Sequence, residues 1–174
     1  MEVFDCIRRR RTVREFKPDP IPEEVVYKIL QAGRWAPSSS NSQPWHFVVV
    51  QARDTLEKLG AIATQGAFIA NAPLAIAIVV DNATRPQLDA GRALQQMELV
   101  AWSEGMGTCF VGVRSADQQS AVKQLLSIPP GMELITIMPY GYRLPGSRGQ
   151  GTPRKPMSEM AHRERFGASY VPVE

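Results

Sequence analysis

The residues with the greatest capacity for ligand chemistry lie in a short loop between two prolines. Between Pro37 and Pro44 stand the polar residues Ser38, Ser39, Ser40, Asn41, Ser42 and Gln43. Proline fixes φ and restricts the residue before it, so the loop is expected to have a defined shape. Its hydroxyl and amide groups suit a flat ligand with a polar edge, such as a flavin ring. On the loop alone, an ordinary capped turn between a helix and a strand stays equally open.

A second candidate ligand segment is a cluster of arginines near the start of the sequence. Five arginines occupy the seven positions from Arg8 to Arg14, with Thr12 among them. Guanidinium groups match phosphate oxygens in bidentate fashion, and a threonine hydroxyl can add a further bond, so the cluster is a candidate phosphate clamp. A solvated helix end and a nucleic-acid or targeting patch are the alternatives. The nucleic-acid interpretation is disfavoured because no second basic stripe with interleaved aromatic residues follows.

A third candidate segment, GMGTCFVG, runs from Gly105 to Gly112. Glycines around a short apolar strand allow backbone N–H groups to approach a ligand closely. The segment lacks the GxGxxG order of a dinucleotide fingerprint and the Gly-Lys-Ser/Thr ending of a P-loop. It therefore favours backbone contacts to a ligand without indicating a nucleotide-binding motif.

The remaining reactive residue types form no catalytic set. The two histidines, His46 and His162, have no metal-ligand spacing with Cys6 and Cys109, so no metal is expected. No GxSxG elbow or persuasive carboxylate pair is present, and His46 is interpreted as structural. Polar ligand loops without an acid–base set are typical of an enzyme whose cofactor carries the chemistry.

Length and composition bound these interpretations. A sequence of 174 residues predicts a single domain, 1–174, with a sizeable core. The formal charge of +3 only slightly favours anionic partners. Two cysteines outside any CxxC pattern, with no signal peptide, predict reduced thiols and a cytoplasmic location. No apolar run approaches the roughly 20 residues of a membrane span, so no membrane partner is expected.

Apolar periodicity predicts the helices and strands that position the three segments. Helices are expected around 3–7, from Pro22 to the polar loop, and at 53–59, 87–104, 115–126 and 158–166, with strands at 47–50, 74–80 and 134–138. The strand at 47–50 is expected to be fully buried, and that at 74–80 to be central. Ser115 and Gln118 form a plausible capping box. Small alanines on 87–104 would permit close packing across a subunit interface.

Taken together and in this order, the three segments resemble the FMN-dependent nitroreductase family. The matching segments are RRRTVREF at 9–16, APSSSNSQPWHFVVV at 36–50 and GMGTCFVG at 105–112, followed by YGY at 140–142 and RKP at 154–156. The resemblance implies an α+β, nitroreductase-like fold, with a mainly antiparallel central sheet flanked by helices. It also implies an obligate homodimer with two FMN sites at the interface.

The resemblance also assigns cofactor-binding residues. For the phosphate and ribityl oxygens these are Arg10, Arg11 and Thr12, with Arg154 and Lys155 closing on the phosphate. Arg14 is expected to face the pyrimidine edge of the flavin. The backbone at Val111 and Gly112 is expected to reach N5 and O4. The other subunit is expected to contribute Pro37, Ser38, Ser39 and Asn41.

Two features depart from the family pattern. Where many members have an asparagine and a lysine near the flavin, the best matches here are Gln65 and Phe68. Gln65 could still hydrogen-bond the ribityl chain or the ring, whereas Phe68 supplies no charge, which would leave Arg14 as the main cation. The insertions that cover the substrate pocket in larger relatives are missing, so an open pocket is expected.

The resemblance implies an FMN-dependent NAD(P)H oxidoreductase. Hydride would pass through flavin N5, in a ping-pong cycle, to a nitroaromatic, a quinone or a similar electron-poor acceptor. The residues do not choose between NADH and NADPH. Reductive dehalogenation, flavin fragmentation and a flavin-binding module without turnover are the alternatives. Neither nucleic acid nor membrane is an expected partner.

Overall fold

The computed structural model describes residues 2–146 and 152–170. The helices are α1 (Val3–Arg9), α2 (Glu23–Arg34), α3 (Arg53–Ile62), α4 (Pro86–Ser103) and α5 (Ala116–Leu125). The strands are β1 (Trp45–Val50), β2 (Leu74–Val80), β3 (Met106–Thr108) and β4 (Glu133–Tyr142). Three short 3₁₀ segments complete the set: η1 (Ser39–Asn41), η2 (Thr64–Asn71) and η3 (Met157–Glu159).

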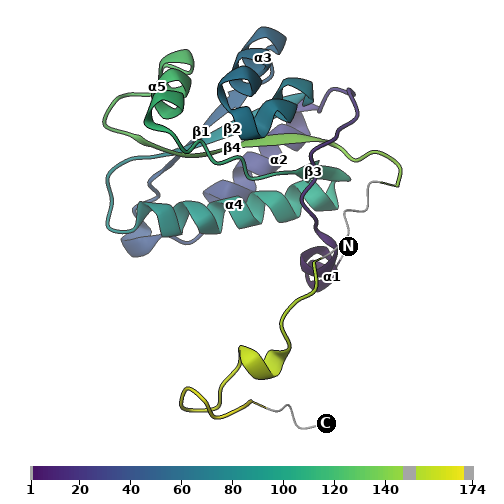
Figure 1. Cartoon of the computed structure of the whole chain (residues 1–174), viewed down its shortest axis with the longest axis vertical. Coiled ribbons are helices and arrows are strands. Elements are labelled where there is room, and N and C mark those ends of the chain that lie inside the picture. The colour runs from purple at the N-terminus through teal and green to yellow at the C-terminus, as the bar shows by residue number, and fades with distance from the viewer. Residues whose placement is uncertain (1, 147–151, 171–174) are drawn as a thin grey trace.

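The four strands form one antiparallel sheet in the order β1-β2-β4-β3. Helices α2 and α4 cover one face, and α3, η2 and α5 cover the other (Figure 1). Although antiparallel strands can be joined by tight hairpins, each connection between successive strands here contains a helix, and these helices cover the sheet faces. This architecture confirms the predicted α+β fold with an antiparallel sheet between helices.

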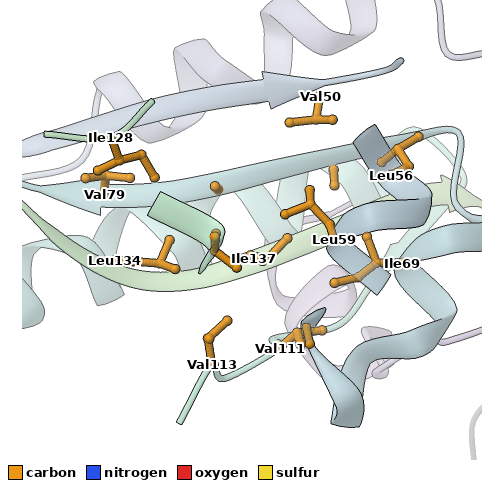
Figure 2. Close-up of a cluster of buried hydrophobic side chains, with 14 of the residues drawn as sticks. Val50, Leu56, Leu59, Ile69, Val79, Val111, Val113, Ile128, Leu134 and Ile137 are labelled. Atoms are coloured by element: carbon orange, nitrogen blue, oxygen red, sulfur yellow. The ribbon is translucent and has the colours of Figure 1, made fainter. Parts of the chain in front are cut away.

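Strand β2 is the centre of the core, and all seven of its residues are buried. Successive side chains of a strand point to opposite faces, so a buried strand contributes side chains to the hydrophobic cluster on each face of the sheet. Leu74, Ile76 and Ile78 pack with α2 and α4. Ala75, Ala77 and Val79 pack with α3, η2 and α5, in the cluster that Figure 2 shows. The predicted central strand is confirmed with the predicted bounds.

The prediction for β1 was partly wrong. The strand begins at Trp45, not Phe47, and it is not fully buried, because His46 and Val49 are exposed. It pairs only with β2 and ends the described sheet on one side, so part of its surface faces solvent. Its position at the edge depends on the order of the strands, which a local run of apolar residues does not encode.

The predicted last helix, 158–166, was also wrong. Within that range only Ser158 and Glu159, the last two residues of η3, are helical, and the chain then turns back, with Tyr170 N–H donating to Ala161 C=O at 3.0 Å. Almost all side chains from 152 to 170 are exposed, so no apolar surface is available to stabilise a helix. Figure 1 shows this C-terminal arm (residues 152–170) running away from the sheet and past α1.

No helix within the described ranges combines the length and the apolar character that crossing a bilayer would require. The predicted strand-like tail at 170–174 lies almost wholly outside the described residues.

Candidate functional site

The arginine segment lies against the β3 edge of the sheet. After α1 the chain becomes extended, and Val13 N–H donates to Thr108 C=O at 2.9 Å. A parallel bridge joins Thr12 to Thr108, and Lys17 N–H donates to Tyr142 C=O at 2.9 Å. Figure 1 shows this purple segment passing the end of the sheet near β3. Two motifs that are far apart in the sequence are therefore hydrogen-bonded neighbours.

Glycine at position 107 permits this close approach. A Cβ placed on Gly107 would lie 2.5 Å from the Val13 side chain. Val13 is 5% exposed and packs with Cys6 and Trp102, whereas Thr12 and Arg14 are exposed. This alternation follows the period of two in an extended segment. Because Val13 is buried against α1 and α4, Thr12 and Arg14 point to the opposite side of the segment. There their exposed side chains are accessible to a ligand.

The neighbouring arginines are partly engaged within the protein. Arg10 Nε lies 3.4 Å from a carboxylate oxygen of Glu98, on α4. Arg11 Nη1 donates to the carbonyls of Arg8 and Arg10, at 2.6 and 2.9 Å. These contacts fix the direction of both side chains while leaving other guanidinium donors for an anion.

Glu98 is a residue of this region that the sequence analysis missed. Burial raises the pKa of its carboxyl, and the guanidinium of Arg10 opposes that shift. The negative charge of Glu98 also acts on Tyr140, whose pKa burial raises strongly. An acidic residue on a helix is usually a solvated surface group, so nothing in the local sequence marked this one as partly buried.

The segment after β3 brings a backbone donor to the same place. The Cys109 thiol is buried, which raises its pKa, and the Arg14 guanidinium beside it opposes the shift. Val111 N–H donates to Ile137 C=O at 3.1 Å, and Val111 C=O accepts from Ile137 N–H at 3.2 Å. The Val111 backbone is therefore occupied by β4. Among the described residues, none accepts a hydrogen bond from Gly112 N–H, so Gly112 is the better candidate donor to a ligand.

Segment η2 packs on this loop, on the face of the sheet that α3 and α5 also cover. A Cβ on Gly66 would lie 2.4 Å from Cγ1 of Val111, so this contact requires glycine. Gln65, the preceding residue, is exposed beside the loop. Gln118 Nε2 donates to Thr64 Oγ1 at 3.1 Å, which ties η2 to α5. The structure thus brings together the regions of Arg14, Gln65 and Gly112. These regions, together with the arginine segment, are called the half-site below.

The polar loop after α2 is held in an unusual backbone conformation. Ser40, Asn41 and Gln43 have positive φ angles of 53°, 55° and 48°. Left-handed conformations are costly for residues other than glycine and concentrate at functional sites. Ser38 Oγ accepts from Gln43 N–H at 2.9 Å, which closes the loop on itself. The loop is therefore shaped by the protein before any ligand is present.

This polar loop and the arginine half-site lie at different parts of α4. Ser39 N–H donates to the Asp89 carboxylate at 3.0 Å, near the start of α4, whereas Arg10 contacts Glu98. These carboxylates are nine residues apart, or about 13 Å along a helix axis. An open hollow of about 500 Å³ lies beside the loop, between Pro37 and the Gly91–Gln96 face of α4.

Arg154 and Lys155 lie in the C-terminal arm and are exposed. The arm runs past α1 rather than toward the half-site at β3 (Figure 1). The described chain therefore does not bring these two residues together with Arg14 and Gly112. Within the described ranges, no group of three or more His, Cys, Asp or Glu residues could hold a metal ion.

The fold is an α+β arrangement in which two groups of candidate ligand residues contact different parts of α4. The model of the nitroreductase family matches residues 7–83 and 64–142. The chain belongs to the nitroreductase family, and the resemblance seen in its motifs is confirmed.

Named relatives support the same assignment. The chain is 34% identical over 156 residues to the "Putative NADH dehydrogenase/NAD(P)H nitroreductase" of Methanothermobacter thermautotrophicus, covering 85% of this chain and 82% of the relative. It is 25% identical over 188 residues to the FMN reductase [NAD(P)H] of Bacillus subtilis, covering 95% of this chain and 74% of that protein.

A solved structure agrees in fold. The FMN-dependent nitroreductase of Clostridium difficile R20291 superposes with a TM-score of 0.79 at 28% identity. The superposition covers 94% of this chain and 99% of that one. The short length of the present chain therefore has a structural counterpart.

Proposed function

We propose that this protein is an FMN-dependent NAD(P)H oxidoreductase that reduces nitroaromatics, quinones or similar electron-poor acceptors in a ping-pong cycle. The observation that carries the proposal is that the segment of Thr12 and Arg14 lies along β3, the strand that leads directly into the loop of Cys109 and Gly112. An exposed guanidinium, a hydroxyl and a backbone N–H without a partner among the described residues suit the anionic and polar-edged parts of FMN. Its relatives' names support the same cofactor and electron donors.

Each residue of the half-site has a separate task in this proposal. Arg10, Arg11 and Thr12 hold the phosphate and ribityl oxygens, and Arg14 neutralises negative charge at the pyrimidine edge. Gly112 N–H fixes the polar edge of the ring, while Val111 holds this loop on β4. When bound, FMN would supply the chemistry by accepting a hydride from the nicotinamide and passing two electrons to the acceptor.

The proposal includes a homodimer in which the polar loop of one subunit completes the half-site of the other. The separation of the two regions along α4 supports this arrangement. Exposed apolar side chains on α1 (Val3, Phe4 and Ile7) would also be covered by a second copy. Arg154 and Lys155, on the projecting arm, would then act on the partner's phosphate. Light scattering after gel filtration should give twice the mass of the 19.3 kDa chain.

An absorbance spectrum tests the proposal most directly. Purified protein, stripped of any cofactor and mixed with FMN, should retain a flavin spectrum after desalting. Adding NADH or NADPH without oxygen should bleach it, and a quinone should restore it. Failure to bind FMN in excess would overturn the site assignment. A flavin that binds but never bleaches would instead indicate a binding module without turnover.

A further inference from the structure

Asp89 is a buried carboxylate bonded to the polar loop of the proposed site. It lies on α4 and is 0% exposed. The backbone N–H of Ser39 donates to one carboxylate oxygen at 3.0 Å, and the Ser39 hydroxyl lies 3.4 Å from the other. Arg92, one turn further along α4, donates from Nη1 at 3.0 Å. Asp89 therefore joins a helix to a loop through charge-assisted hydrogen bonds.

Packing alone does not explain an aspartate at this position. A buried charge is unfavourable unless it is paired and hydrogen-bonded. The neighbouring buried positions on α4 hold alanines, Ala90 and Ala93, which fit a close helix contact without that penalty. The guanidinium partner, Arg92, has a side chain that is 42% exposed, so solvent screens it. The ion pair with Arg92 therefore does not account for a carboxylate at this position. The hydrogen bond that Asp89 accepts from the Ser39 N–H of the polar loop does.

The loop in turn depends on Asp89. Ser40, Asn41 and Gln43 hold positive φ angles, a conformation that persists only when the surroundings enforce it. Bonds within the loop run from Gln43 N–H to Ser38 Oγ and from Asn41 N–H to Ser38 C=O. Across the described residues, the hydrogen bonds from 38–43 to another element are those to Asp89. Asp89 is thus the anchor that fixes the loop on the body of the protein.

We propose that Asp89 is a positioning residue that holds the Pro37–Pro44 loop in the conformation that binds the flavin. This inference rests on the proposed function. Asp89 does not touch the flavin and acts through Ser39. Its loss should weaken FMN binding more than it weakens the fold, and it should leave the chemical step intact once FMN is bound.

The test is a titration of the apoprotein with FMN, in which binding is measured from the quenching of flavin fluorescence. Asp89→Asn keeps the shape but removes the charge, and it should raise the Kd for FMN about tenfold, since hydrogen bonds to charged groups are among the strongest. At saturating FMN, kcat with a quinone should stay within about twofold of the wild type. That separation of Kd from kcat distinguishes positioning from a direct catalytic role.

Two control variants separate the anchor from general effects. Asp81→Asn makes the same chemical change at an exposed position, where the carboxylate faces His46 at 3.4 Å, and should leave the Kd unchanged. Met97→Ala removes buried side-chain volume on α4 but leaves the hydrogen bonds of Asp89 in place, and it should lower the Tm without changing the Kd. If Met97→Ala weakens FMN binding as much as Asp89→Asn does, the effect is one of stability and the inference fails.

A second pair of variants keeps the inference testable if Asp89→Asn does not fold. Ser39→Ala removes only the hydroxyl, whereas Ser39→Pro also removes the N–H that Asp89 accepts. The Kd for FMN should be higher for Ser39→Pro than for Ser39→Ala, and equal values would overturn the inference. Wild-type protein that binds no FMN would overturn the proposed function itself. Wild-type binding with an equal Kd for Asp89→Asn would overturn only the role of Asp89.

Discussion

The guanidinium carbon of Arg143 lies 3.9 Å from the centroid of the Trp102 ring. The same side chain donates from Nη1 to the carbonyls of Trp102 and Met106, at 3.1 and 2.7 Å. It therefore caps the C-terminal end of α4 and holds the start of β3, the strand on which the arginine segment lies. One side chain after β4 thus links the helix to the edge of the sheet.

Arg143→Lys should lower the free energy of unfolding by about 1–2 kcal/mol, because an ammonium cannot stack on the ring and bond both carbonyls at once. Urea denaturation followed by circular dichroism would measure the loss. Arg34→Lys is a matched control, since Arg34 lies over the exposed ring of Trp35 at 5.6 Å. The control should change stability by less than about 0.5 kcal/mol. Equal effects at the two positions would contradict the capping role.

Glu98 should make stability depend on pH in a defined direction. Its pKa in the folded protein is raised above the ordinary value of 4.5, chiefly by burial. Its contribution to stability is then fully present below pH 4.5 and is lost as the pH rises through the raised folded-state pKa. Glu98→Gln should therefore gain stability relative to the wild type as the pH rises through this window.

Urea denaturation of Glu98→Gln and wild type at several pH values would measure this trend. Glu57→Gln, at an exposed position paired with Arg53, provides the control and should show a nearly constant difference. A Glu98→Gln difference that is flat from acid to neutral pH would show that the carboxyl titrates normally.

Arg14→Ala should weaken FMN retention about tenfold or slow reduction by NAD(P)H, because the half-site loses its exposed guanidinium. The same change should raise the pKa of the Cys109 thiol further, since Arg14 now opposes the effect of burial. The ultraviolet absorbance of the thiolate against pH, compared between Arg14→Ala and the wild type, measures the second effect without any flavin. Arg34→Ala removes a surface arginine elsewhere and should alter neither. Unchanged FMN affinity and unchanged hydride transfer in Arg14→Ala would count against its role.

Gly66→Ala should destabilise the protein by about 1–3 kcal/mol, because the added Cβ would overlap the Val111 side chain. The clash should also move η2 away from the loop that carries Gly112. Gly131→Ala is the control, since a Cβ there meets nothing within 4 Å. Thermal unfolding of both variants would reveal the difference, and a Tm for Gly66→Ala at or above that of the control would refute the close contact.

The parts of the fold that local sequence determines were predictable. The bounds of β2 followed from an unbroken apolar run, and the start of α5 followed from Ser115, whose side chain accepts from Gln118 N–H at 3.1 Å. The membership of the nitroreductase family was also predictable, because the three candidate ligand segments occur in the order that the family uses.

The features that sequence analysis missed depend on contacts between distant residues. The exposure of β1 follows from its place in the sheet, and Asp89 and Glu98 are ordinary acidic residues until the loop and the arginine segment pack on α4. The occupied backbone of Val111 became apparent only when β4 was placed beside it. Such pairings require the tertiary arrangement, which periodicity and residue type do not supply.

The two edges of the sheet differ in how readily they could pair with a strand of another chain. At one end, residues 12–17 lie along β3 and β4 and use backbone groups that a foreign strand would otherwise need. At the other end, β1 offers a six-residue edge with one side of its backbone ladder unpaired within the described chain. A strand of another chain would therefore pair most readily with β1, in assembly or in aggregation. This edge lies on the side of the sheet opposite Arg14.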